Sequence, residues 1–177
     1  MAANTIDPVA AANEYREALL TALGDRDPAA VQAATPVELR RLIADAGDDL
    51  RTRPEAGEWS VLELVGHFSD AELVLSTRYR FILAEDTPPI QAYDQDLWAT
   101  RMRHNDASPE DLLDPFEAVR RSNVALWQAS SPEDHARYGI HAERGPESYE
   151  LTFWLAAGHD LFHLDQARQT LAAVRAR

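Results

Sequence analysis

A chain of 177 residues, 45% of them hydrophobic and 27% charged, has the composition of an ordinary soluble globular protein. This length predicts a single domain over residues 1–177, large enough to bury a core without disulfide bonds. Thirty acidic residues against 17 basic ones give a formal net charge of −13, which disfavours binding to nucleic acid or to anionic membranes. The arginine pairs Arg40-Arg41 and Arg120-Arg121 stand among acidic residues, and we interpret them as solvated helix faces.

The sequence contains no cysteine, so it offers neither a disulfide framework nor a thiolate ligand or nucleophile. No apolar run approaches the roughly 18 residues of a membrane-spanning helix. The residues after Met1 lack the basic and apolar regions of a signal peptide. We therefore expect a cytoplasmic protein without a membrane partner.

Capping signals and prolines predict helices in five parts of the chain. These run from Asp7 to about Leu23, from Thr35 to about Leu50, from Ser60 to about Leu83, from Ser108 to about Ser130 and from Ser148 to about Arg175. Thr35-Pro36-Val37-Glu38 and Ser60-Val61-Leu62-Glu63 both have the form of a capping box. No stretch alternates at period two, so we expect helices and little else.

Four long helices with one or two short accessory helices predict an all-α four-helix bundle. The connection between residues 84 and 108 is long enough to run the whole length of a 24-residue helix, about 36 Å. Such a link allows the second and third long helices to run parallel. We therefore expect an up-down-down-up arrangement.

Two histidines near the end of the chain, His159 and His163, stand four residues apart in an apolar helical stretch. Four residues advance a helix by about 400°, so both rings lie on one stripe, about 6 Å apart in rise. That spacing lets two ring nitrogens bind one divalent cation, and His67 supplies a third ligand from another helix. Gly66 and Gly158 precede His67 and His159, and glycine inside a helix usually permits a close backbone approach. Two helices in contact at these glycines would deliver the imidazoles to a shared point.

Three imidazoles suit zinc, nickel or another borderline divalent transition metal. No cysteine is available to close the site, so one coordination position stays open for water or substrate, as in catalytic sites. A metal held in this way lowers the pKa of a bound water towards about 7 and acts as a Lewis acid on a substrate. The alternative is a bundle that packs three histidines without a metal.

Two polar residues accompany this motif. Asp160 interrupts an otherwise apolar run, where a carboxylate needs a partner. That partner is either the free N–H of a metal-bound imidazole on a neighbouring helix, or Arg78 or Arg80. Gln166 lies three residues beyond His163, and it either lines the same cavity or lies at the bundle end.

The remaining candidates for substrate contact lie outside the long helices. Tyr93 belongs to the long crossover, a loop of a length that is often functional, and could form a lid or a substrate wall. His104, His135 and His141 stand in polar or turn-like surroundings, which predicts surface positions. His141 could instead reach a cavity mouth, and so joins Tyr93 and Gln166 as a candidate substrate-binding residue.

Two blocks resemble the DinB superfamily, which includes YfiT-like metal-dependent enzymes. Residues 58–68, Glu-Trp-Ser-Val-Leu-Glu-Leu-Val-Gly-His-Phe, are similar to the family's Trp-Ser block that ends in a metal histidine. Residues 158–166, Gly-His-Asp-Leu-Phe-His-Leu-Asp-Gln, look like its C-terminal His-Asp-x-x-His-x-x-Gln block. The resemblance implies an up-down-down-up bundle, a metal held by His67, His159 and His163, and often a homodimer.

Family members of known activity transfer or use low-molecular-weight thiols of the bacillithiol and mycothiol class. The resemblance therefore favours a metal-dependent enzyme that transfers such a thiol cosubstrate to a small electrophile. A metal-dependent hydrolase is the first alternative, and its general base would be Asp160 or Glu63. The other alternative is a stress-response protein that binds a metal or a small ligand without catalysis.

Overall fold

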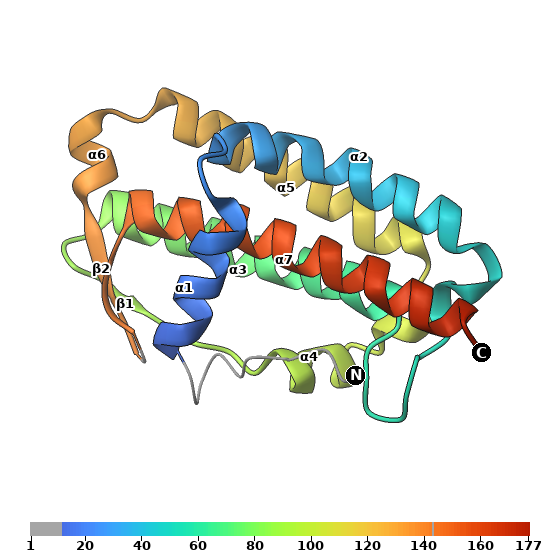
Figure 1. The fold of residues 1–177 in the computed structure, drawn as a ribbon. Coiled ribbons are helices and arrows are strands. Elements are labelled where there is room, and N and C mark those ends of the chain that lie inside the picture. Colours follow the sequence, from blue (N-terminus) through green and yellow to red (C-terminus); the bar gives the residue numbers. More distant parts are fainter. Residues whose placement is uncertain (1–11, 143) are drawn as a thin grey trace.

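A computed structural model describes residues 12–142 and 144–177 of the chain. Four long helices form a bundle: α2 (Pro28–Ala46), α3 (Val61–Ala84), α5 (Pro109–Ala129) and α7 (Tyr149–Arg175) (Figure 1). The shorter helices are α1 (Ala12–Leu23), η1 (Gly47–Arg51), α4 (Gln95–Arg101), η2 (His104–Asp106) and α6 (Pro132–Ala136). None of the helices within these residues has both the length and the apolarity needed to cross a membrane.

Side-chain contacts along the bundle fix the direction of each helix. Ser60, just before α3, bonds to Asn105, just before α5, and further along the same helices Arg80 donates to Ser122. The two helices are therefore parallel, while α2 and α7 run the other way (Figure 1). The structure confirms the predicted up-down-down-up bundle, and residues 85–108 form the crossover that this topology requires.

Local capping places the starts of three bundle helices where the sequence predicts them. Ser60 accepts a bond from the Glu63 backbone N–H, and the Glu63 carboxylate accepts one from the Ser60 N–H, completing a capping box. Ser108 and Ser148 accept equivalent bonds at the starts of α5 and α7. The predicted end of the first helix is also confirmed, because Gly24 follows Leu23 with a φ of +56°. Its predicted start near Asp7 lies outside the described residues.

The predicted start of the second helix at Thr35 is wrong. Helix α2 begins at Pro28, where Asp27 is the N-cap, and Pro36 lies inside it. A proline removes the N–H that would bond to the carbonyl four residues earlier, here Gln32. That carbonyl instead accepts a bond from Arg120 Nη1 at 3.1 Å. Thr35-Pro36 therefore marks a contact with another helix rather than a helix start.

A small sheet, which the sequence did not predict, stands at one end of the bundle. Strand β2 (Tyr138–His141) pairs in parallel with β1 (Pro89–Ile90) and antiparallel with β3 (Gly145–Ser148). The strands have at most four residues, and even the alternating burial of β2 spans only two cycles, too few to stand out in the sequence. The sheet ties the crossover to the start of α7 (Figure 1).

The bundle core consists of two main apolar clusters with a polar layer between them. One cluster surrounds Phe68 and Phe116, and the other surrounds Tyr79 and Phe153. The polar layer holds Arg120, which is 2% exposed and so does not lie on the solvated face that the sequence predicts. The other buried members of this layer are Gln32, Thr35, Glu72, Asn123 and Asp160.

The two helical glycines do permit close approach, but not to each other. A Cβ on Gly158 would stand 2.1 Å from the backbone oxygen of Leu19 in α1, and one on Gly66 would stand 2.3 Å from the ring of His104 in η2. The prediction that they join the two histidine-bearing helices is therefore wrong. Gly158 instead seats α1 against α7, while Gly66 accommodates the His104 ring beside α3.

We expect Gly158→Ala to lower the free energy of unfolding by roughly 1–3 kcal/mol, because the new methyl overlaps α1 backbone that has little room to move. Urea unfolding would measure the loss. Ala172→Ser, an exposed substitution on the same helix, should cost no more than about 0.7 kcal/mol, the difference in helix propensity. A gain of about 1 kcal/mol in Gly158→Ala, as helix propensity alone predicts, would contradict the contact.

Candidate metal centre

Helices α3 and α7 bring three imidazoles to one point. One ring nitrogen each of His67, His159 and His163 lies within 4.8 Å of the other two, and the Nε2 atoms of His67 and His159 are 2.9 Å apart. The ring centroids are separated by 4.3–4.9 Å. Because α3 and α7 are antiparallel, His67 in the first third of α3 meets the middle of α7. The structure thus assembles the three residues that the sequence predicts as ligands.

All three rings are held in the neutral form. Burial lowers the pKa of His67 and His159 well below the usual value, and each is lowered further by the neighbouring imidazoles. Burial also lowers the pKa of His163 to about 4, although its bond to Gln166 opposes that shift. Neutral imidazoles present lone pairs rather than positive charge, which is the state that binds a cation.

Gln166 fixes the orientation of the His163 ring. Its Oε1 atom accepts a bond from His163 Nδ1 at 2.7 Å, so the Nδ1 atom carries the proton. The lone pair is then on Nε2, which lies 3.5 Å from the hydroxyl of Tyr15 in α1. Gln166 therefore lies behind a predicted ligand. Both positions considered for it from the sequence, in the cavity and at the bundle end, are wrong.

Aromatic side chains enclose the imidazole cluster on its inner side. Trp59 lies 5.1 Å from the His67 ring, and Phe68 lies 6.0 and 6.2 Å from the rings of His159 and His163. Phe162 contacts the His163 ring at 5.1 Å. Side chains of this kind keep water away from the cluster and restrict rotation of the rings.

The donor set fits a borderline divalent metal with an open coordination position. Within the described residues, the cluster contains no carboxylate or fourth imidazole whose donor atom lies near the other three. His67 and His159 also line a pocket with a cavity volume of about 100 Å³. A cation on these nitrogens would therefore face a space that can admit a small molecule.

Two of the predicted substrate-contact residues line the same pocket as the histidines. Tyr93 reaches it from the crossover and packs against Trp98 at 4.8 Å, while His141 reaches it from β2. His141 is 2% exposed and His104 is 4% exposed, so the prediction that they lie on the surface is wrong for both. His104 instead bonds to Asp70 at 2.7 Å beside α3.

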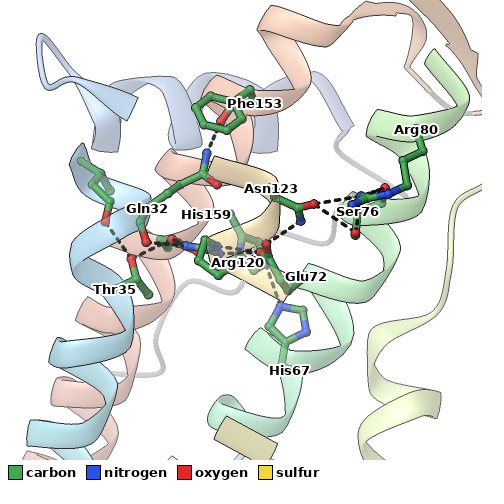
Figure 2. A network of polar contacts seen from close by, with 12 residues as sticks. Gln32, Thr35, His67, Glu72, Ser76, Arg80, Arg120, Asn123, Phe153 and His159 are labelled. Carbon is green, nitrogen blue, oxygen red and sulfur yellow. Dashed lines mark hydrogen bonds and ion pairs between the residues drawn. The ribbon is translucent and has the colours of Figure 1, made fainter. Parts of the chain in front are cut away.

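Asp160 has a different partner from either of the predicted ones. Its carboxylate accepts bonds from both terminal nitrogens of Arg120, and Thr35 donates to it at 2.7 Å. Figure 2 shows Arg120 with Thr35 on one side and Glu72 on the other. Asp160 thus faces the polar layer while His159 beside it faces the imidazole cluster, because consecutive helical residues point about 100° apart.

Tyr15 and Arg78 are two polar residues of the pocket that the sequence did not identify as candidates for the site. Tyr15 belongs to α1, which packs against α7. The only signal of this packing in the sequence is Gly158, whose missing side chain lets α1 approach. Arg78 lies eleven residues after His67, which is close to three helical turns and hence on the same stripe of α3. That spacing was visible in the sequence.

Comparison with known proteins supports the fold and the metal centre. A model of the DinB superfamily matches residues 30–167. Two proteins of Oceanobacillus iheyensis are 28% identical over 130 residues (73% of this chain, 75% of theirs) and 24% identical over 125 residues (71% and 72%). YfiT of Bacillus subtilis is 25% identical over 109 residues, 61% of each chain. All three are provisionally named metal-dependent hydrolases.

The solved structure of Bacillus subtilis YfiT has the same fold. It aligns with a TM-score of 0.74 and 19% sequence identity over 96% of this chain and 90% of YfiT. YfiT is described as a probable metal-dependent hydrolase with an unusual four-helix bundle topology.

We expect the metal-free protein to lose stability as the pH falls from about 6.5 towards 4. Unfolded histidines bind protons near pH 6.5, whereas the folded state keeps His163 neutral down to about pH 4, so acid favours unfolding. This one residue should remove about 3 kcal/mol across that range. Urea unfolding with a chelator present would measure it. The slope should be shallower in His163→Gln, and equal slopes would show that His163 titrates normally.

Proposed function

The chain belongs to the DinB superfamily, and we propose that it is a metal-dependent hydrolase that acts on a small molecule bound in the pocket beside His67 and His159. The observation that carries this proposal is the convergence of three neutral imidazoles, two of which, His67 and His159, line an open pocket. Buried histidines that served packing alone would have no reason to present lone pairs to a shared point.

His67, His159 and His163 would hold zinc or nickel, which are matched to nitrogen donors. When bound, such a metal activates water and polarises a scissile carbonyl. The chain supplies the orientation: Gln166 keeps the His163 lone pair on Nε2, and the aromatic wall excludes water from the inner side. The other side of the imidazole cluster faces the pocket.

Tyr15 and His141 are two groups of the pocket that can donate or accept a hydrogen bond or a proton. Burial raises the pKa of Tyr15 above its usual value, so its hydroxyl stays protonated and can donate to a substrate oxygen near His163. His141 Nδ1 accepts a bond from the Arg144 backbone N–H at 3.3 Å, which leaves the proton of the neutral ring on Nε2. Burial lowers the pKa of His141 to about 4, so it is neutral at physiological pH.

Thiol transfer is the second candidate function. None of the residues described as lining the pocket is Asp or Glu, so no carboxylate stands ready to deprotonate water there. Glu63, one of the two general bases considered, pairs with Arg53 and caps α3. A thiol needs no such base, because coordination itself releases its proton. The chain has no cysteine, so the thiol would come from a cosubstrate of the bacillithiol or mycothiol class.

We expect protein purified without an affinity tag to contain close to one divalent transition metal per chain by elemental analysis. His67→Ala should lose the metal, because two imidazoles of one helix bind it too weakly, whereas His135→Ala should retain it. His135 is the matched control, since it is an imidazole stacked on Trp127 away from the cluster. A metal-free native protein would leave only the packed-histidine interpretation.

Catalysis is tested with the metal-loaded protein on panels of esters and amides, and on electrophiles with a thiol cosubstrate. Loss of ester or amide cleavage by at least 100-fold on chelation, with recovery on adding metal, would support hydrolysis. Metal-dependent thiol adducts without hydrolysis would favour the second candidate. A loaded protein inactive in both panels would be a binding protein.

We expect Gln166→Leu to weaken metal binding about 10–100-fold, the usual cost of removing the partner of a metal-bound imidazole. A competition titration with a chromophoric chelator would measure it. Gln169→Leu is the control, because Gln169 bonds only to Asp165 on the exposed side of the same helix. An unchanged metal affinity in Gln166→Leu would mean that the Gln166 bond does not orient His163.

A further inference from the structure

The pocket beside the histidines is positively charged in a strongly negative protein. Three arginines line it, Arg16, Arg78 and Arg144, and no Asp or Glu does so among its described lining residues. The chain as a whole carries 30 acidic and 17 basic residues. A local excess of this sign in a concave site concentrates small anions.

Arg78 forms no ion pair with a carboxylate of the described residues, and it is distinguished from Arg16 by a buried donor atom without a partner. Its Nη2 atom donates to the backbone oxygen of Gln91 at 2.7 Å, but its buried Nε atom has no hydrogen-bond partner among the described residues. No described carboxylate forms an ion pair with it. Burial, and then the charge of Arg144, lower the pKa of Arg78, and the more weakly acting carboxylate of Glu147 opposes this shift without reversing it.

Arg144 is balanced by a carboxylate of its own. It binds Glu147 through Nε and Nη2 at 2.7–3.2 Å, and Glu147 is only 1% exposed. This pair lies in and beside the turn that joins β2 to β3. The unbalanced charge in the pocket therefore belongs to Arg78 and Arg16, both partly buried, and of these two Arg78 has the buried Nε atom without a partner among the described residues.

The pocket extends from the histidines to Arg78 along α3. His67, Ala71, Val74 and Arg78 occupy one stripe of the helix, and eleven residues correspond to about 16 Å between the Cα atoms of His67 and Arg78. Long helical side chains lean towards the N-terminus, which brings the guanidinium nearer to the histidines.

Helix α7 contributes a matching stripe from the other side. Thr152, Leu155, Ala156 and His159 all line the pocket, and α7 runs antiparallel to α3. The site thus has three parts in sequence: imidazoles at one end, an apolar middle, and Arg78 at the other end.

We propose that this pocket selects small molecules with an apolar body and a terminal carboxylate or phosphate, and that Arg78 binds this anionic end. The placing of the reacting bond beside the histidines rests on the proposed function, but anion binding by Arg78 does not. A planar guanidinium whose Nε–H has no hydrogen-bond partner among the described residues can donate the paired hydrogen bonds that a carboxylate or phosphate accepts.

A structural role for Arg78 makes a different prediction. A partly buried charge without an ion pair opposes folding, so the single Gln91 contact gives little reason for an arginine at this position. If Arg78 serves a ligand, Arg78→Met should leave the melting temperature unchanged or raise it. Arg120→Met should lower it, since Glu72 and Asp160 would lose their shared cation.

The test is a titration of the full chain, metal-free and zinc-loaded, with hexanoate, hexyl phosphate and the neutral isostere hexanamide. Heteronuclear NMR of the arginine Nε–H groups reports the contact directly. In the metal-free protein, at least one anion should bind ten or more times tighter than hexanamide and shift the Arg78 Nε–H resonance. Whether hexanoate or hexyl phosphate binds more tightly shows which anionic group the pocket prefers. Comparison with the zinc-loaded protein shows whether the carboxylate of hexanoate binds the metal instead of Arg78.

Arg78→Met should weaken binding of that anion at least tenfold, and Arg78→Lys should weaken it less. Arg80→Met is the control, because Arg80 lies two residues later and bonds to Ser76 and Asn123 outside the pocket. The proposal is overturned if hexanamide binds as well as both anions, if Arg78→Met binds them normally, or if neither anion binds at millimolar concentration. Metal content and turnover, measured separately, decide the proposed function whichever result is obtained.

Discussion

The guanidinium of Arg120 links its own helix, α5, to the other three helices of the bundle. It donates to Gln32 of α2 and to Glu72 of α3 (Figure 2), and also to Asp160 of α7. Asp160 follows His159 directly, and Glu72 lies five residues after His67 on α3. One side chain thus sets the register of the two helices whose imidazoles meet. Burial alone would lower the pKa of Arg120, but Asp160 and Glu72 overcome this effect and raise it, so the cation persists.

A charged layer of this kind contributes more to specificity than to stability. Replacing buried ion pairs by apolar side chains is often neutral or stabilising, whereas removing one partner is costly. The two apolar clusters alone would let the helices shift along one another, whereas the Arg120 contacts can form in only one register of the helices. The proline inside α2 belongs to the same arrangement, because it frees the Gln32 carbonyl that Arg120 requires. The metal centre then depends on a network that touches no metal.

Whether a feature could be predicted from the sequence depends on how far apart in the chain the interacting residues lie. Helix starts at Ser60, Ser108 and Ser148 are fixed by bonds within four residues, and the predictions there are confirmed. The convergence of the histidines follows from a spacing of four on one helix and a resemblance in two blocks. The errors concern residues whose partners are distant in the chain. Thr35 and Asp160 bond across 125 residues, and His104 bonds to Asp70 across 34. No local pattern encodes those partners.

Arg120 and Arg78 show why burial alone does not reveal what a charge is for. Arg120 is buried and Arg78 is partly buried, yet two carboxylates neutralise the first and none of the described carboxylates forms an ion pair with the second. The same contrast separates the surface from the pocket. A net charge of −13 repels extended polyanions such as nucleic acid, because their many phosphates meet the whole surface. A small anion that has entered the pocket meets the local charge instead, in surroundings where water screens it poorly. Overall acidity and selection of anionic small molecules are therefore compatible properties of one chain.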